Sequence, residues 1–165
     1  MSIDVDKLMK ALDNDANEGI MNLTSEKLIE MNLKILQELA LDKETTLGML
    51  KKLKEYKYID SLCELRNGAF LRWIPLTNPE DIYLTNGAIL CDIKMTDNGT
   101  QLVCKTFSKK HISLKMDENL IFQKLSGQEL IILTALDHLD KDISEHENKE
   151  DISEAEDDEE EDEYD

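Results

Sequence analysis

Apolar and polar residues alternate along a series of short segments between Gly68 and Leu125. The alternation is clearest over residues 88–95, where Asp92 and Lys94 fall on one side and the other side carries Ile89, Cys91, Ile93 and Met95. A period of two residues is typical of a β-strand that buries one of its faces. The pattern therefore predicts a strand whose apolar set points into a core.

A turn signal follows this segment directly. Asn98-Gly99 is a dipeptide that tolerates positive φ, which the two central residues of a tight hairpin require. Residues 101–107 then return as an alternating segment. We predict a hairpin with Asn98-Gly99 at its tip, in which residues near 89–96 pair with residues near 101–107.

Further alternating segments occupy residues 69–74, 111–116 and 120–125. The first should stop at Pro75, because proline cannot donate a hydrogen bond to a sheet. About five strands, spaced by roughly ten residues, are typical of a small all-β module. We predict a small curled antiparallel β-sheet or barrel-like module.

Helical patterns precede this module. Residues 3–12 form a short amphipathic stretch, and residues 25–41 carry a broad apolar stripe. Asp42 is a suitable N-cap for a further helix, whose pattern continues, with a possible kink, as far as Leu65. The helix should end before Asn67-Gly68, a pair that disrupts helices.

The sequence Ser126-Gly127-Gln128-Glu129 reads as a capping box, in which Ser126 and Glu129 satisfy each other's backbone amides. A C-terminal capping helix should therefore begin there and cover an open face or end of the β-module. The predicted class is α+β, with a helical region at 1–66, an antiparallel β-module with its capping helix at 67–142, and a disordered acidic tail at 143–165.

Charge is concentrated at the C-terminal end. Residues 144–165 contain fourteen Asp or Glu and one Lys, so they carry −13 of the formal net charge of −18. Such a segment cannot bury enough apolar surface to offset its chain entropy. It can attract basic proteins over a long range, which makes it a candidate acidic partner-binding tail. Its densest run is Glu156, Asp157, Asp158, Glu159, Glu160, Glu161, Asp162 and Glu163.

The β-module carries a cationic counterpart to this tail. A small barrel can expose cations beside its strands and bind a nucleic acid or a partner protein there. The low aromatic content of 5% gives little support to recognition by base stacking. The candidate nucleic-acid or partner patch comprises Arg72, Lys94, Lys105, Lys109, Lys110, His111 and Lys115.

Catalytic and metal-binding patterns are weak. Cys63, Cys91 and Cys104 form no CxxC pair, and free thiols are expected in a reducing compartment. A pair between His111 and one of the inward cysteines is conceivable, but no third residue that would orient it can be named. We therefore expect no enzyme activity, no metal site and no cofactor.

The chain has no apolar run long enough for a membrane span and no signal-peptide pattern at its start. We expect an intracellular protein without a membrane partner.

Three stretches carry a resemblance to a known group of proteins. They are Leu65–Ile74 (LRNGAFLRWI), Leu84–Lys94 (LTNGAILCDIK) and Phe122–Ser126 (FQKLS). Over roughly residues 50–140 the chain resembles uncharacterised small proteins encoded by large DNA viruses. The resemblance implies a setting in the host cytoplasm or the virion and adds no mechanism.

Two functional hypotheses follow from these patterns. The first is a non-enzymatic protein-interaction module whose acidic tail engages or screens basic partners. The alternative is a nucleic-acid-binding small β-barrel that is autoinhibited by its acidic tail.

Overall fold

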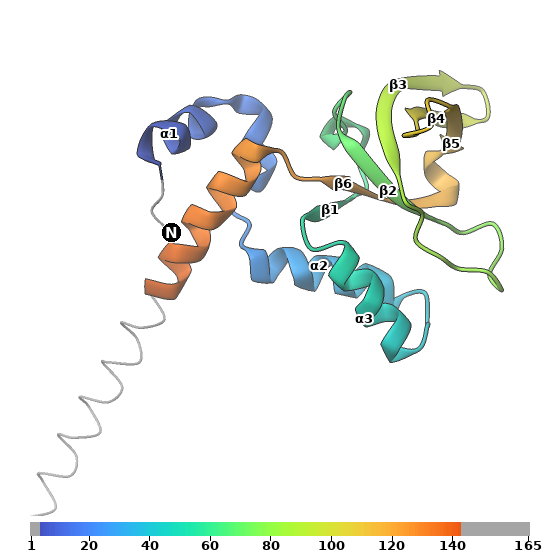
Figure 1. Cartoon of the computed structure of the whole chain (residues 1–165), viewed down its shortest axis with the longest axis horizontal. Helices are drawn as coiled ribbons and strands as arrows, with labels where there is room; N and C mark the ends of the chain where they lie inside the picture. The colour runs from blue at the N-terminus through green and yellow to red at the C-terminus, as the bar shows by residue number, and fades with distance from the viewer. Residues whose placement is uncertain (1–3, 143–165) are drawn as a thin grey trace, which may run out of the picture. The chain divides into compact units, whose positions relative to one another are not determined.

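A computed structural model describes residues 4–142 of the chain (Figure 1). The described residues form two compact units, each treated by itself below. One comprises residues 4–25 together with 131–142, and the other comprises residues 26–130.

The first unit is helical. Helix α1 spans Val5–Asp13 and begins at Asp4, whose carboxylate accepts hydrogen bonds from the amides of Asp6 and Lys7. A 3₁₀ helix, η1, follows at Asp15–Ile20. The C-terminal helix contributes its residues 131–142, and the Asp137 carboxylate accepts hydrogen bonds from the Ser25 amide at 2.8 Å and hydroxyl at 2.5 Å. These bonds tie the two chain ends of this unit together.

The second unit begins with two helices, α2 at Ser25–Gln37 and α3 at Lys43–Lys52. Asp42 caps α3 as predicted, because its carboxylate accepts a hydrogen bond from the Thr45 amide at 3.2 Å. Hydrogen bonds from the hydroxyl and amide of Thr45 lower the pKa of Asp42. The predicted continuation of this helix to Leu65 is wrong, since the chain turns into a strand after Leu53.

The sheet has six antiparallel strands in the order β1-β6-β2-β3-β4-β5. Short 3₁₀ turns, η2 at Leu62–Glu64 and η3 at Met116–Glu118, lie in the connections. The strands are β1 Tyr56–Ile59, β2 Phe70–Pro75, β3 Ala88–Thr96, β4 Gly99–Lys105, β5 His111–Lys115 and β6 Asn119–Lys124. Strand β1 was not predicted from the sequence, although Tyr and Ile favour strands.

A single apolar cluster spans one face of the sheet from edge to edge. Ile59 on the edge strand β1 and Leu114 on the edge strand β5 both belong to this cluster, together with Trp73 near the middle of β2. The sheet is antiparallel as predicted, but its strands do not close into a barrel, because β1 pairs only with β6 and β5 only with β4.

A second apolar cluster lies on the other face of the sheet. Phe122 and Ile74 from the sheet meet Leu36 of α2 and Met49 of α3, and all are nearly or fully buried. Helices α2 and α3 thus cover the β1-β6-β2 part of the sheet (Figure 1).

The inward face of β3 differs from the prediction. Ile89, Cys91 and Met95 are exposed, and Ala88 and Leu90 fill the core instead. The register shifts between Leu90 and Asp92, which marks a β-bulge at this point. A bulge inserts one extra residue and resets the alternation, so Ile93 alone of the predicted set packs against the core.

The predicted β3–β4 hairpin is confirmed, with its tip one residue earlier. Thr96 pairs with Gly99, so Asp97 and Asn98 are the turn residues. Gly99 carries the positive φ of +115°. Glycine is also required at Gly87, where φ is +92° and an added Cβ would lie 2.3 Å from the carbonyl oxygen of Leu71.

The predicted capping box is confirmed at the start of the C-terminal helix, which the structure describes over residues 127–142. The Ser126 amide donates to the Glu129 carboxylate at 2.9 Å, and the Glu129 amide donates to the Ser126 hydroxyl at 3.1 Å. The capping role of this helix stays a prediction. The α+β class with N-terminal helices and a C-terminal helix is confirmed, and the predicted tail lies outside the described residues.

Candidate functional site

The two edge strands of the sheet, β1 and β5, differ in the hydrogen-bond partners of their outward backbone groups. At the β1 edge, the amide of Leu125 donates to the carbonyl of Glu55, and this bond sets the alternation of the β1–β6 ladder. Backbone groups of Tyr56 and Tyr58 consequently point away from β6. Left in an apolar environment without partners, such groups would destabilise the fold.

Asn32 of α2 satisfies these groups with its side chain. Its Nδ2 donates to the Tyr56 carbonyl at 2.8 Å, and its Oδ1 accepts from the Tyr58 amide at 3.2 Å. Asn32 is only 1% exposed. Its amide therefore acts as a one-residue substitute for a neighbouring strand and closes the β1 edge.

At the β5 edge, no such side chain spans the middle of the strand in the part of the chain that the structure describes. The Thr106 amide donates to the Lys110 carbonyl at 2.9 Å, which sets the alternation of the β4–β5 ladder. The backbone groups of Ile112 and Leu114 consequently face β4, and those of His111 and Ser113 face outward. Only the far end is covered, where Asn119 Nδ2 donates to the Lys115 carbonyl at 2.7 Å.

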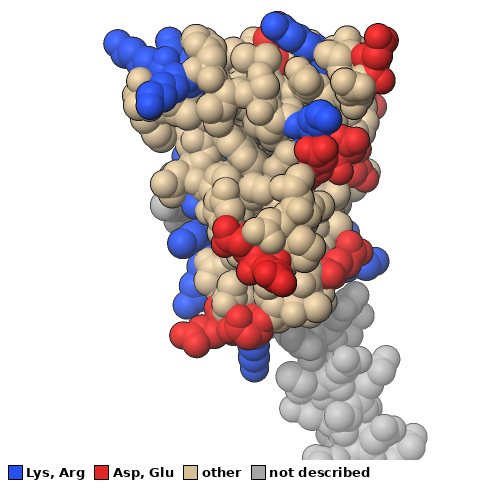
Figure 2. All heavy atoms as spheres, turned by 90° about the vertical axis from the view of Figure 1, so that its right-hand side faces the viewer, with Lys and Arg blue, Asp and Glu red and all other residues tan. Residues whose placement is uncertain are grey.

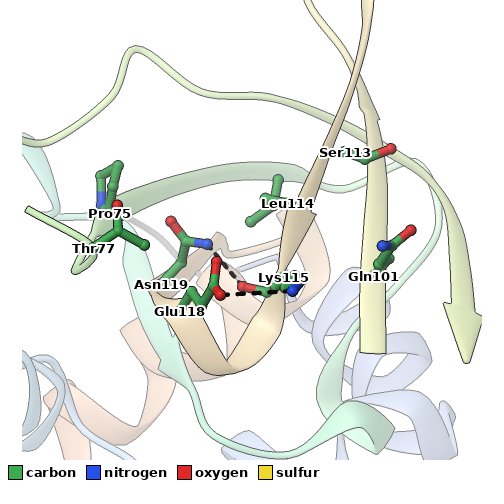
Figure 3. A pocket seen from close by; sticks show the side chains of 8 residues that line it. All are labelled: Pro75, Thr77, Gln101, Ser113, Leu114, Lys115, Glu118 and Asn119. Atoms are coloured by element: carbon green, nitrogen blue, oxygen red, sulfur yellow. Dashed lines mark hydrogen bonds and ion pairs between the residues drawn. The ribbon is translucent and has the colours of Figure 1, made fainter. Parts of the chain in front are cut away.

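A groove runs beside this open edge (Figure 3). Its volume is about 380 Å³, and Pro75 and Thr77 form the wall opposite β5. Leu114 points from β5 toward that wall, and Ser113 points to the other side of the strand (Figure 3). At its lower end lie Asn119 and the ion pair of Lys115 Nζ with Glu118 Oε1 at 3.7 Å.

The strand register brings part of the predicted cationic patch together. The face of β3, β4 and β5 directed away from the core holds Lys94, Lys105, His111 and Lys115. Lys109 and Lys110 lie in the turn that leads from β4 into β5. Arg72 lies on the same face of the sheet but outside this group, on β2, where it pairs with Phe122 of β6 and its Nε donates to the Thr85 carbonyl at 2.9 Å.

Acidic side chains interrupt this cationic face. Asp92 projects from it, and Asp117 and Glu118 follow the end of β5. The view from the side of these strands shows Lys and Arg in separate groups, mostly toward its margins, with Asp and Glu among them and a broad uncharged middle (Figure 2). Positive charge is therefore concentrated at the start of β5 rather than spread over the face.

The cysteines do not combine with the histidine of the sheet. Cys104 is fully buried in the core, and burial raises the pKa of its thiol to about 11. His111 lies on the outer face, opposite to the side chain of Cys104. Cys91 was predicted inward and is exposed at the bulge, and Cys63 is also exposed.

Residues 4–142 show no candidate metal site and no candidate membrane span. No group of at least three His, Cys, Asp or Glu side chains in this range is placed to hold a metal ion. No helix in the same range combines the length and the apolar character needed to cross a bilayer.

The residues that distinguish the two edges were not predicted from the sequence. Asn32 stands four residues after Leu28 and four before Leu36, in the middle of the buried face of α2. A lone amide at that position is the signal that could have identified it. The acidic residues of the predicted tail, Glu156 to Glu163, lie outside the described residues.

Comparisons with known protein families, with curated proteins and with solved structures find no match to this chain.

Proposed function

We propose that this chain is a non-enzymatic interaction protein that docks a protein partner on its sheet while its acidic tail engages or screens basic surfaces of that partner. The observation that supports the docking role is the difference between the two edges. The Asn32 amide closes β1, and β5 keeps outward backbone groups beside a groove. An open edge is a ready template for pairing with another chain.

The role of the tail is supported by its charge. With −13 of the net −18 in residues 144–165, the tail generates a field that attracts basic surfaces, and salt screens that attraction. The proposed setting is the interior of a host cell or a virion, in line with the resemblance to proteins of large DNA viruses.

Affinity capture with the full-length chain tests this function. The expected partner is a protein with a basic surface that is retained after nuclease treatment and lost when residues 144–165 are deleted. A partner that disappears on nuclease treatment alone would contradict the proposal, since nucleic acid would then hold the complex together.

The alternative is a nucleic-acid-binding sheet that the tail inhibits as a tethered competing polyanion. It is favoured by one observation, the common face of Lys94, Lys105, His111 and Lys115. In that case deletion of residues 144–165 should raise the affinity for single-stranded oligonucleotides, and the gain should weaken steeply with salt. Charge reversal of Lys105, Lys109, Lys110 and Lys115 should abolish it.

A further inference from the structure

We propose that the β5 edge binds an extended segment of a partner protein as an added β-strand, and that this segment places acidic side chains beside the cations at the start of β5. The inference rests on the protein-binding function proposed above and specifies its docking site and the chemistry of the segment that is bound.

The backbone supplies the affinity. His111 and Ser113 present amide and carbonyl groups away from β4, as the alternation of the β4–β5 ladder requires. A strand laid along this edge would satisfy them with main-chain hydrogen bonds. The added strand should stop near Lys115, because Asn119 already occupies its carbonyl at 2.7 Å.

The groove sets which side chains the segment carries. Side chains of an added strand alternate between the two faces of the sheet. Those that stand beside Leu114 would enter the space of about 380 Å³ between β5 and the wall of Pro75 and Thr77. A segment with small or β-branched apolar residues at every second position fits this arrangement.

The charges around β5 determine which residues of the bound segment occupy the positions between the apolar ones. Side chains beside His111 would lie on the outer face, close to Lys105, which pairs with His111, and next to the turn with Lys109 and Lys110. At the other end of β5, Asp117 and Glu118 follow in sequence. Opposite charges on neighbouring strands stabilise a sheet, and like charges destabilise it. The acidic residues of the segment therefore belong at the start of β5.

Two other occupants fit less well. A second copy would bring together chains of net charge −18, and β5 spans only His111–Lys115, a short edge for a stable dimer. Single-stranded nucleic acid is held largely by stacking on a series of aromatic rings. Strands β3, β4 and β5 contain no Phe, Tyr or Trp, and the exposed ring of Phe107 in the turn between β4 and β5 is a single platform that already lies 5.6 Å from the ring of Phe70.

The test uses the full-length chain and a capped synthetic peptide, EVEVEVE, with KVKVKVK as the charge-reversed control. Titration should show that the acidic peptide binds at least about tenfold more tightly than the basic one at low salt. Hydrogen exchange should show that the peptide protects the amides of His111 and Ser113. The amides of Ile112 and Leu114 face β4 and should change little.

A pair of variants at one position separates strand addition from side-chain contact. Ser113→Pro removes an outward amide that β4 does not use, so the fold should survive, because proline is tolerated where a strand amide faces solvent. It should weaken binding of EVEVEVE at least about tenfold. Ser113→Val keeps the amide and favours a strand, and it should bind the peptide as the natural chain does. Thermal unfolding of both variants checks that they fold.

Charge reversal at the turn tests the placement of the acidic residues. Lys109→Glu combined with Lys110→Glu should remove most of the preference for EVEVEVE over KVKVKVK. The matched control, Lys51→Glu with Lys52→Glu on α3, makes the same change in net charge away from β5 and should preserve most of that preference.

Several results would overturn the inference. If neither peptide binds, or if the amides of His111 and Ser113 stay unprotected, the lysines merely protect this edge from unwanted pairing. If an oligonucleotide or a second copy of the chain protects these amides instead, the β5 edge does not bind a partner segment and the proposal is refuted. A captured protein partner that Ser113→Pro binds equally well would leave the proposed function standing and refute the β5 site. Failure to capture any protein, with peptide binding intact, would refute only the function.

Discussion

Strand β1 and strand β5 stand at opposite ends of one sheet, and among the described residues only β1 has its outward backbone groups covered by a buried side chain. At β1 the buried Asn32 amide meets the carbonyl of Tyr56 and the amide of Tyr58. At β5 the outward groups of His111 and Ser113 have no such cover among the described residues. A helix side chain can thus seal an edge that lies near the interior, and an edge at the surface can stay open because water satisfies its backbone.

The largest expected effect comes from removing the seal at β1. Asn32→Leu should lower the free energy of unfolding by about 2–4 kcal/mol, because it leaves two buried backbone groups without partners. Urea unfolding monitored by circular dichroism measures this change. Ser113→Val on the open edge is the matched control and should alter stability by less than about 0.5 kcal/mol. Similar losses for the two variants would remove the distinction between the edges.

A smaller loss is expected in the hairpin that precedes the open edge. Gly99→Val should cost on the order of 1 kcal/mol or more, because a β-branched residue resists the φ of +115°. Crowding should add little, since the nearest atom to an added Cβ is a carboxylate oxygen of Asp117 at 3.9 Å. The midpoint of thermal unfolding measures the effect. An unchanged midpoint would show that the turn can relax to another conformation.

The buried thiol of Cys104, on β4 beside β5, can report whether this half of the sheet unfolds locally in the native state. Burial raises the pKa of Cys104 from its ordinary value of 9.0 to about 11, so the folded state holds this proton more tightly than the unfolded state. Its contribution to stability is complete below pH 9 and is lost as the pH rises toward 11. Burial also raises the pKa of Tyr56 and Tyr58, which act in the same direction.

The free energy of unfolding should therefore decline as the pH rises from 8 to 11. In the Cys104→Ala variant this decline should be smaller. Alkylation at pH 8 followed by mass spectrometry adds a second reading, in which Cys63 and Cys91 react readily and Cys104 reacts slowly. Equal labelling of all three thiols would mean that the β5 half opens often in the native state.

The smallest effect is expected from the tail. Deletion of residues 144–165 should leave the midpoint of thermal unfolding nearly unchanged, because an acidic segment with so few apolar residues contributes few native contacts. Differential scanning fluorimetry at moderate salt suffices for this comparison. A drop of many degrees would mean that the tail stabilises the folded part of the chain, and hydrogen exchange at His111 and Ser113 would show whether the open edge is involved.

Short-range patterns predicted much of the fold. The Asp42 cap, the capping box at Ser126 and the β3–β4 hairpin depend on residues close in sequence, and all were found. The predictions failed where a distant partner decides the outcome. The Tyr56–Ile59 segment becomes a strand because it pairs with β6, and the bulge at Cys91 arises where β3 adjusts its pairing with β4.

The candidate site was only partly predictable for the same reason. Alternation assigned Lys105, His111 and Lys115 to polar faces, and the register then placed them on one surface. Arg72 lies on the same face, but it stands apart from them on β2, half-buried, with its Nε bonded to the Thr85 carbonyl. The open edge is a property of strand order, which appears only when the whole sheet is assembled.

The buried amide of Asn32 also limits how large an assembly of this protein can become. In the language of polymer chemistry, a sheet with one reactive end is a chain terminator, since coupling consumes its only end and growth stops. A sheet with two reactive ends is a bifunctional monomer and can propagate without limit. Asn32 keeps the protein in the first category, so its loss would permit fibre growth as well as lower stability.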